Sequence, residues 1–254
     1  MKKFAAILIA LTLSLALLAT AGAEAAFTTI EAGKITYATS PDFPPFESRD
    51  DEDNIIGIEP DIMALIGEKL GLEVEAVPMD FTSALLAAQL GKTDLVVSGV
   101  TATGEKAIER STWFDFTDTY VDIKQAIVFK ADAGITMDNL GEQSIGVQAG
   151  TTGQDLCEDT FGEEIVTAYD TYSLAFQALL NGQVDCIVLD GPVGNAYVAQ
   201  HPELTMVETT FDVESYAFGV YKQDTGLLEA LNAALQELIA DGTVENIINE
   251  WYSK

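Results

Sequence analysis

An acidic side chain at the end of an apolar run is the first feature of this chain that could do chemistry. The run 186–189 predicts a buried strand, and Asp190 follows it directly. A buried carboxylate needs a cation or a set of hydrogen-bond donors. Asp190 therefore either holds a positively charged group or caps the turn that Gly191 and Pro192 predict, and both interpretations fit the residues.

Residues for metal or nucleophilic chemistry are few. The chain has one histidine, His201, and two cysteines, Cys157 and Cys186. Zinc sites of the Cys/His kind and histidine-dependent nucleophilic catalysis therefore have little to draw on, and we expect neither a metal nor a cofactor. An oxidising compartment would allow a disulfide between the two cysteines. We expect two separate buried thiols instead, because nothing in the sequence shows that the cysteines are adjacent.

The charge balance excludes several classes of partner. Asp and Glu number 41 against 12 Lys and Arg, so the formal net charge is −29. Nucleic-acid binders present a basic face, which this chain lacks the residues to build, and anionic membrane surfaces would repel it. With 254 residues, 48% of them hydrophobic, the chain can bury the core of one large domain or of two ordinary ones.

The first 26 residues have the order of a secretory signal peptide. Lys2 and Lys3 precede an apolar run over residues 4–19, and small residues with A-x-A spacing follow at residues 21–25. The run is shorter than the ~20 residues that a membrane span needs, which argues against an anchor. No cysteine lies near the cleavage point to carry a lipid, so we expect an exported, periplasmic protein.

Strands and helices alternate along the rest of the chain. Apolar runs predict strands at residues 34–39, 74–77, 94–97, 125–129, 144–147, 165–169 and 184–189. Helical spacing predicts helices at residues 60–70, 83–90, 105–112, 154–159, 174–180, 227–239 and 244–251. The alternation predicts an α/β fold with parallel sheets and helices on their faces.

One segment of the chain occurs twice in similar form. At an offset of 91 residues, Gly91 matches Gly182 and Asp94 matches Asp185, each between a helix and an apolar strand. Two weakly similar α/β lobes explain the match, and chance similarity is the alternative. If the lobes face each other, the carboxyl ends of their strands point into one shared cleft, where such folds bind ligands.

Short motifs occur in a fixed order along almost the whole mature chain. They are FPPF at residues 43–46, IGIEPDI at 56–62, SGVTAT at 98–103, FTDTY at 116–120, GVQAGTT at 146–152, VLD at 188–190 and DGT at 241–243. The ordered set resembles the bacterial extracellular solute-binding proteins of polar amino-acid ABC transporters, family 3 of that class. The resemblance implies a two-lobed Venus-flytrap fold of type II, each lobe a mixed sheet flanked by helices. It implies lobe I over residues 27–120 and 217–254 and lobe II over residues 121–216, after a signal peptide over residues 1–26.

The resemblance also implies a cation for the carboxylate of an amino-acid ligand. In the family an arginine follows the segment that corresponds to residues 98–103. Counting forward from Ser98 places Lys106 there, whereas counting backward from the next motif places Arg110 there. We favour Arg110, because Glu109 before it fits the family's Glu-Arg pair and a guanidinium binds a carboxylate through two hydrogen bonds. Lys106 is the rival, and a solvated helix face is the alternative for both.

Further ligand contacts follow from the same resemblance. Thr151, Thr152 and the backbone amides at the start of their helix would hold the ligand carboxylate from lobe II. The ligand ammonium would meet the Asp190 carboxylate, the Thr101 hydroxyl and the Gly99 carbonyl. With the resemblance, the ligand-binding interpretation of Asp190 leads over the turn cap.

The resemblance assigns the ligand side chain to two aromatic rings and two polar groups. Phe43 and Phe81 match the aromatic pair of the family, and their rings would bury an aliphatic stem; the alternative is that each packs in the core. Relatives for histidine, arginine or glutamine carry an acid where this chain has Ser40, and Gln148 stands where lobe II reads the side chain. We therefore expect a polar, uncharged ligand such as glutamine.

Basic amino acids are the second choice of ligand, because the acids Asp42 and Glu47 lie near Ser40 in the sequence. Neither acid receives a role of its own, and with Trp113 and Tyr172 they are expected at the surface or in packing. The expected ligand-binding residues are Ser40, Phe43, Phe81, Ser98, Gly99, Thr101, Lys106, Arg110, Gln148, Thr151, Thr152 and Asp190.

The function that the resemblance implies is capture without chemistry. Two lobes would close on a free amino acid, and the closed form would dock on the transmembrane subunits of an ABC permease. We expect a monomer that is not an enzyme. The alternative is a cyclohexadienyl or arogenate dehydratase on the same fold, although no acid is singled out as the general acid it needs. A receptor's sensing domain and an adhesive protein are weaker alternatives, because no span follows Trp251 and adhesion leaves the motifs unexplained.

Overall fold

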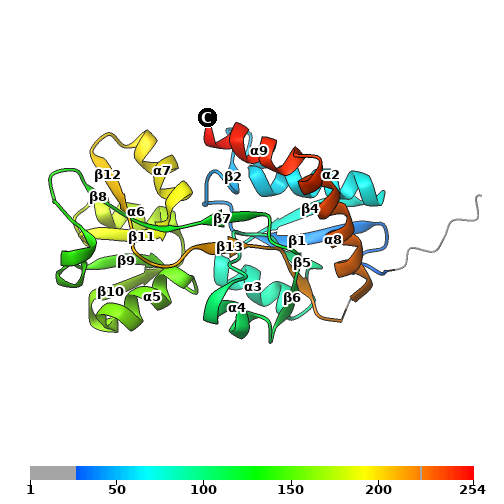
Figure 1. The fold of residues 1–254 in the computed structure, drawn as a ribbon, viewed down its shortest axis with the longest axis horizontal. Coiled ribbons are helices and arrows are strands. Elements are labelled where there is room, and N and C mark those ends of the chain that lie inside the picture. Colours follow the sequence, from blue (N-terminus) through cyan, green and yellow to red (C-terminus); the bar gives the residue numbers. More distant parts are fainter. Residues whose placement is uncertain (1–26, 224) are drawn as a thin grey trace, which may run out of the picture.

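Two five-stranded sheets form the centres of two lobes (Figure 1). The computed structural model describes residues 27–223 and 225–254, so the predicted signal peptide over residues 1–26 lies outside the described residues. The sheet of lobe I has the order β4-β1-β5-β14-β6, with strands Glu73–Pro78, Lys34–Thr39, Leu95–Val96, Gly219–Tyr221 and Phe114–Phe116. The sheet of lobe II has the order β10-β9-β11-β8-β12, with strands Val166–Tyr169, Ile145–Gln148, Cys186–Asp190, Gln125–Lys130 and Leu204–Glu208.

Both sheets are mixed. In lobe I, β1 runs parallel to β4 and β5, whereas β14 runs antiparallel to β5 and β6. In lobe II, β9 runs parallel to β10 and β11, whereas β8 runs antiparallel to β11 and β12. The expectation of two lobes, each a mixed sheet flanked by helices, is confirmed. Helices cover the sheet faces, which is why a central strand such as β11 is buried along its whole length.

Two short strands run between the lobes. β7 (Val121–Ile123) leads from lobe I to lobe II, and β13 (Glu214–Tyr216) leads back. They pair antiparallel, with Glu214 opposite Ile123 and Tyr216 opposite Val121, and Figure 1 shows this ribbon between the two lobes. An isolated bridge also pairs Tyr216 with Thr101 of lobe I. A connection of two extended strands can act as a hinge, because small changes in their dihedral angles rotate one lobe against the other.

The helices of lobe I are α2 (Ile58–Leu70), α3 (Phe81–Gln89), α4 (Gly104–Arg110), α8 (Thr225–Ala240) and α9 (Thr243–Tyr252). Helix α2 packs against α8 and α9, and α3 packs against β1 and β5. Helix α2 ends at Gly71, whose φ of 68° is a left-handed conformation that glycine adopts without strain. Helix α3 begins where the Asp80 carboxylate accepts the Ser83 N–H. The Asp80 cap fixes the start of α3, where Phe81 faces the space between the lobes.

The helices of lobe II are α5 (Thr152–Phe161), α6 (Tyr172–Leu180) and α7 (Gly191–Gln200), with 3₁₀ turns η1 (Met137–Glu142) and η2 (Glu163–Ile165). The sequence analysis predicts neither α7 nor β12, nor the small hairpin of β2 (Ser48–Arg49) and β3 (Ile55–Ile56). The turn at Gly191 and Pro192, which was the alternative interpretation of Asp190, does not form, because Pro192 lies in the first turn of α7, where a missing N–H costs nothing.

The repeated segment takes the same form in both lobes. In lobe I, the Asp94 carboxylate accepts the Thr36 N–H of the neighbouring strand β1 at 2.7 Å. In lobe II, the Asp185 carboxylate accepts the Ser144 N–H just before β9 at 2.9 Å. Each aspartate thus ties the start of its own strand to the strand beside it, and the match at an offset of 91 residues reflects one structural device used twice.

Both cysteines are free thiols in the core of lobe II, as the sequence analysis expects. Cys157 on α5 and Cys186 on β11 are fully buried in one hydrophobic cluster. Burial raises the pKa of the Cys157 thiol to about 12. At neutral pH that thiol therefore stays protonated and unreactive.

Candidate functional site

A cavity between the lobes brings together almost all the residues that the sequence analysis selects. The space between its walls is about 300 Å³, which includes solvent at its open side. The Arg110 guanidinium of lobe I donates to the Gly150 carbonyl oxygen of lobe II at 3.0 Å, so the lobes are closed. All the selected residues except Lys106 line the cavity, namely Ser40, Phe43, Phe81, Ser98, Gly99, Thr101, Arg110, Gln148, Thr151, Thr152 and Asp190.

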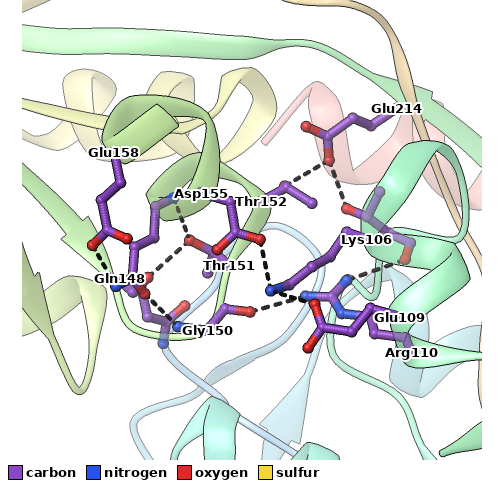
Figure 2. Close-up of polar contacts among 12 residues, drawn as sticks. Lys106, Glu109, Arg110, Gln148, Gly150, Thr151, Thr152, Asp155, Glu158 and Glu214 are labelled. Carbon is purple, nitrogen blue, oxygen red and sulfur yellow. Dashed lines mark hydrogen bonds and ion pairs between the residues drawn. The ribbon is translucent and has the colours of Figure 1, made fainter. Parts of the chain in front are cut away.

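Arg110 is the buried cation of the cavity. It is the last residue of α4 and only 1% exposed. Its Nη1 donates to the carbonyl oxygen of Thr101 at 3.1 Å, and its Nη2 crosses to lobe II and donates to the carbonyl oxygen of Gly150 at 3.0 Å (Figure 2). Its buried Nε has no partner among the described residues. Burial lowers the pKa of Arg110 to about 10, so the guanidinium stays charged at neutral pH and keeps a free donor.

The start of helix α5 lies across the cavity from Arg110, as Figure 2 shows. Thr151 caps this helix by accepting the Gln154 N–H at 3.2 Å, and its hydroxyl donates to the Gln148 carbonyl oxygen at 2.8 Å. The first N–H groups of a helix lack partners within it, and the helix dipole makes this end attractive to anions. Together with the guanidinium, the N-terminus of α5 gives this part of the cavity a positive potential.

Asp190 is the buried carboxylate that faces the cavity. It occupies the N-cap position of α7, yet its side chain makes no capping hydrogen bond; instead it accepts the Gln125 Nε2 at 2.8 Å. The turn-cap interpretation is therefore wrong. Burial, reinforced by the nearby Glu214 carboxylate, raises the pKa of Asp190 to about 8. The Arg110 charge acts in the opposite direction but does not outweigh these two effects.

Glu214 of the returning strand β13 joins the two lobes beside the cavity. Its Oε2 accepts the Thr101 hydroxyl of lobe I at 2.6 Å and the Thr152 hydroxyl of lobe II at 2.7 Å (Figure 2). Its Oε1 accepts the Gln125 Nε2 at 3.2 Å. Both hydroxyls give their hydrogen to Glu214, so their oxygens are left as acceptors.

Aromatic rings form the walls of the cavity. The ring of Phe81 lies under the guanidinium of Arg110, with 5.6 Å between the guanidinium carbon and the ring centroid. Phe43 of lobe I stacks on Tyr172 of lobe II, with ring centroids 5.7 Å apart. A Cβ on Gly99 would lie 2.5 Å from the Phe43 ring, so only glycine lets this ring approach the backbone.

The far end of the cavity presents oxygen acceptors. The Ser40 hydroxyl donates to Oδ1 of Asp42 at 2.9 Å, and Oδ2 of Asp42 accepts the Tyr172 N–H at the start of α6 in lobe II at 2.8 Å. The Gln148 Nε2 donates to the Asp170 carbonyl oxygen at 3.3 Å. With one hydrogen of each side chain engaged, the Ser40 oxygen, the Gln148 oxygen and the second N–H of the Gln148 amide are the groups left for a ligand side chain.

Lys106 does not line the cavity, contrary to its place in the predicted set. Its ammonium pairs with Asp155 of lobe II at 2.6 Å and with Glu109 at 3.1 Å (Figure 2). Lys106 and Arg110 share one face of α4, because they lie one turn apart. Arg110 reaches the cavity, while Lys106 lines a neighbouring groove that is open to solvent.

Replacing Lys106 by alanine should weaken closure of the lobes slightly. The pair with Asp155 is partly exposed, and such pairs contribute about 0.2–1 kcal/mol. We expect the affinity for the ligand to fall by up to about fivefold at low ionic strength and to match the wild type in concentrated salt, because salt screens exposed pairs. Calorimetric titration at two salt concentrations measures both effects. A salt-independent loss of about 100-fold would mean that Lys106 contacts the ligand itself.

Several residues that contact the site receive no role from the sequence. Gln125 and Glu214 are polar residues within strands, and the sequence contains no motif that marks them. Tyr172 is not a surface residue but fully buried against Phe43. Asp42 and Glu47 stand beside the FPPF motif, and this proximity was the one available signal; Glu47 accepts the Ser98 hydroxyl at 2.8 Å.

The cavity suits a small zwitterion. It holds one buried cation and one buried carboxylate, and it has aromatic walls for an aliphatic stem. Within residues 27–223 and 225–254, no cluster of three or more His, Cys, Asp or Glu could hold a metal ion. The chemistry available is recognition of opposite charges.

Comparison with known sequences identifies relatives of one kind. A family model described as "Bacterial extracellular solute-binding proteins, family 3" matches residues 35–254. The ABC transporter arginine-binding protein 1 of Escherichia coli K12 is 31% identical over 226 residues, which cover 87% of this chain and 91% of the relative.

Solved structures agree with the sequence relatives. An ancestral arginine-binding protein bound to glutamine has a TM-score of 0.81 and 36% identity, and the alignment covers 88% of this chain and all of the other. An ancestral arginine-binding protein bound to arginine has a TM-score of 0.79 and 37% identity, covering 86% of this chain and 98% of the other.

Proposed function

The chain belongs to the bacterial extracellular solute-binding proteins of family 3, and from this premise we propose that it captures a free polar amino acid for an ABC importer. The observation that carries the proposal is the closed cavity that both Arg110 and Asp190 line. A zwitterion brings a carboxylate for the guanidinium and an ammonium for the aspartate. Both buried charges would then be compensated without bulk water.

The cavity residues that would contact the ligand carboxylate and the ligand ammonium are those whose hydrogen-bond donors or acceptors are not engaged elsewhere in the described chain. The carboxylate binds Arg110, whose Nε is a free buried donor, and the backbone N–H groups at the start of α5. The ammonium binds Asp190, the Gly99 carbonyl oxygen and the Thr101 hydroxyl. The last contact is supported by the Thr101 hydrogen pointing at Glu214, which leaves the Thr101 oxygen as an acceptor.

Capture proceeds by closure about the strands β7 and β13. The ligand bridges residues of both lobes, so it binds the closed form better than the open one and shifts the equilibrium toward it. Contacts between the lobes add to this preference: Arg110 to the Gly150 carbonyl oxygen, and Asp42 to the Tyr172 N–H. Loss of one lobe's contacts would therefore weaken both binding and closure.

The ligand side chain ends in hydrogen-bond donors. The Ser40 and Gln148 oxygens accept hydrogens from an amide or a guanidinium, and the second Gln148 N–H can donate to an amide oxygen. A side-chain carboxylate would find no second cation among the described residues that line the cavity. Glutamine is the first candidate, because Ser40 presents a hydroxyl and not a charge. Arginine is the second, because the Asp42 carboxylate lies behind Ser40 and relatives are named arginine-binding proteins.

Calorimetric titration of the mature protein with each standard amino acid tests this function. We expect tight binding of glutamine or a basic amino acid, and glutamate weaker by a factor of about 100 or more, because a buried carboxylate without a cation costs several kcal/mol. Tight glutamate binding would contradict the assigned specificity, and absence of binding by every amino acid would contradict the function. Conversion of prephenate or arogenate would show an enzyme instead.

The protein acts outside the cytoplasm as a monomer that delivers its ligand to the permease subunits. Support comes from the signal-peptide pattern over residues 1–26 and from the extracellular family. Within the described part of the chain, no helix has the length and apolar character to cross a membrane. Mass spectrometry of the exported protein should find a new N-terminus near residue 26, and sedimentation should give one chain per particle.

A further inference from the structure

Two glutamates lie completely buried next to the lobe I side of the cavity. Glu47 follows the proline-rich turn after β1, and Glu59 lies in the first turn of α2. Both have 0% of their surface exposed. Buried carboxyl groups are normally paired with a cation, because removing a lone charge from water is costly.

No cation in the described part of the chain pairs with either of these glutamates. Every ion pair of a Lys, Arg or His found there involves some other acid. The titratable groups that face the two glutamates are themselves acids: the Asp42 carboxyl and the hydroxyls of Tyr37 and Tyr120. Neutralisation must therefore come from a proton.

The two carboxyl groups have unequal sets of donors. Glu59 accepts the Gly99 N–H, at 3.1 and 3.2 Å from its two oxygens, and also the Tyr120 hydroxyl. Its place at the N-terminus of α2 adds the helix dipole. Glu47 accepts one hydrogen, from Ser98 Oγ at 2.8 Å, while its other oxygen is buried without a donor in the described chain. Hydrogen bonds to the charged form favour ionisation, so Glu59 is the better site for the negative charge.

We infer that Glu47 and Glu59 share one proton, with Glu47 as the neutral acid that donates its hydrogen to the Glu59 carboxylate, and that this pair positions the segment Ser98–Gly99. The two buried side chains lie beside each other, because they bind the consecutive residues Ser98 and Gly99. Two carboxylates in contact in a buried site cannot both be ionised.

The pair holds three cavity residues in place. The Ser40 N–H donates to Ser98 Oγ at 3.0 Å, and that hydroxyl passes its own hydrogen to Glu47. The Gly99 N–H is held by Glu59, which leaves the Gly99 carbonyl oxygen to the cavity. Glu47 and Glu59 are thus positioning residues, and this part of the inference rests on the proposed function.

The titration behaviour of the pair agrees with this assignment. Burial, followed by the Glu59 charge, raises the pKa of Glu47 well above its ordinary value. Burial also raises the pKa of Glu59, while hydrogen bonds from Glu47, Tyr120 and Gly99 act in the opposite direction. The proton therefore resides on Glu47.

Infrared spectroscopy of the ligand-free protein at neutral pH tests the shared proton directly. The wild type should show the C=O stretch of a protonated carboxyl group, and the difference spectrum against Glu47→Gln should contain that band. Subtraction removes any band from other protonated acids such as Asp190. A difference spectrum with carboxylate bands only would show that Glu47 is ionised and would overturn the inference, whether or not the protein binds amino acids.

Binding by the two amide variants tests the positioning role. The amide introduced by Glu47→Gln keeps an oxygen for Ser98 and offers an N–H to Glu59, so this variant should bind the amino acid found by titration within about threefold of wild type. Glu59→Gln sets an N–H against the Gly99 N–H and should bind about 10- to 100-fold more weakly. Equal losses in both variants would contradict the assigned direction of the proton.

The pH dependence of the thermal midpoint distinguishes a protonated Glu47 from a Glu47 that only fills space in the core. An acid whose pKa is raised by folding destabilises the fold as pH rises from its unfolded value toward its folded value. The thermal midpoint of Glu47→Gln should therefore rise relative to wild type between pH 5 and pH 8. Asp42 also makes the thermal midpoint depend on pH, but it is present in both proteins, so its effect cancels in the comparison. A constant difference across that range would contradict a proton on Glu47.

Discussion

Replacing Arg110 by alanine should lower the affinity for the amino acid by about 150- to 5,000-fold. Removing one partner of a buried, hydrogen-bonded charge pair costs about 3–5 kcal/mol, because the other charge stays buried without compensation. Arg110 is the one cation that lines the cavity within the described chain, so no neighbouring side chain can take over the ligand carboxylate. Calorimetric titration of the purified variant measures the loss.

Arg49 gives a matched control for that substitution. It is an arginine of lobe I that pairs with Asp53 at 2.8 Å on a surface turn; it does not line the cavity, although it lines a surface depression together with Ser40 and Asp42. Arg49→Ala removes the same charge without touching the ligand carboxylate and should bind within about threefold of wild type. Arg110→Lys should fall between wild type and Arg110→Ala, because an ammonium keeps the charge but loses the paired hydrogen bonds. Wild-type affinity in Arg110→Ala would remove the basis of the proposed function.

The order of the motifs was sufficient to predict most of the cavity. Ser40, Ser98, Gln148 and Asp190 lie far apart in the chain, yet each follows or ends a strand of the two sheets. Strand ends that face one cleft meet there by topology. Residues at such ends are therefore predictable once the strands and the two lobes are recognised.

The distinction between Lys106 and Arg110 was beyond sequence counting. Both lie on one face of α4 and both reach across to lobe II, Lys106 to Asp155 and Arg110 to Gly150. Arg110 lies one helical turn further along α4 than Lys106 and is more deeply buried between the lobes. How deeply each residue lies depends on how α4 is placed against lobe II. Tertiary packing decides this; the one local signal was the Glu109-Arg110 pair, which favoured Arg110 through the resemblance to the family.

The polar residues that the motifs do not mark were missed for another reason. Gln125 and Glu214 act through each other and through Asp190, Thr101 and Thr152. Their hydrogen bonds join strands separated by as many as 113 residues. A buried network of this kind becomes visible only when all its members are in place. Helix α7 was hidden by its Gly-Pro start, which is typical of turns as well as of helix N-termini.

Replacing Asp190 by asparagine should weaken amino-acid binding by about 30- to 5,000-fold, the equivalent of about 2–5 kcal/mol for a buried charge pair that loses one partner. Asparagine keeps the size of the side chain and can still bond Gln125, so the loss reports the charge that meets the ligand ammonium. Titration with the same amino acid as for Arg110→Ala measures it. Unchanged affinity would mean that the ammonium lies elsewhere, with Glu214 as the nearest other carboxylate.

The same variant should change how pH controls closure of the empty protein. With the lobes closed, the pKa of Asp190 is raised to about 8, because burial and Glu214 disfavour its charge; water in the open form relieves both effects. The closed form thus binds the proton more tightly, so acid favours empty closure, and each pH unit below about 8 should shift the equilibrium by up to about tenfold. Fluorescence transfer between labels on the two lobes, measured without ligand from pH 5 to pH 8, should show this slope in wild type.

Asp190→Asn should lose most of that slope, and the remainder would report Asp42, whose pKa burial also raises in the closed form. A bound ammonium supplies the charge that the proton supplies in the empty cavity, so saturating amino acid should remove the slope in wild type as well. An identical slope in wild type and Asp190→Asn would contradict this account. Loss of the slope both in Asp190→Asn and with saturating amino acid would show that the proton and the ligand ammonium compete for one carboxylate.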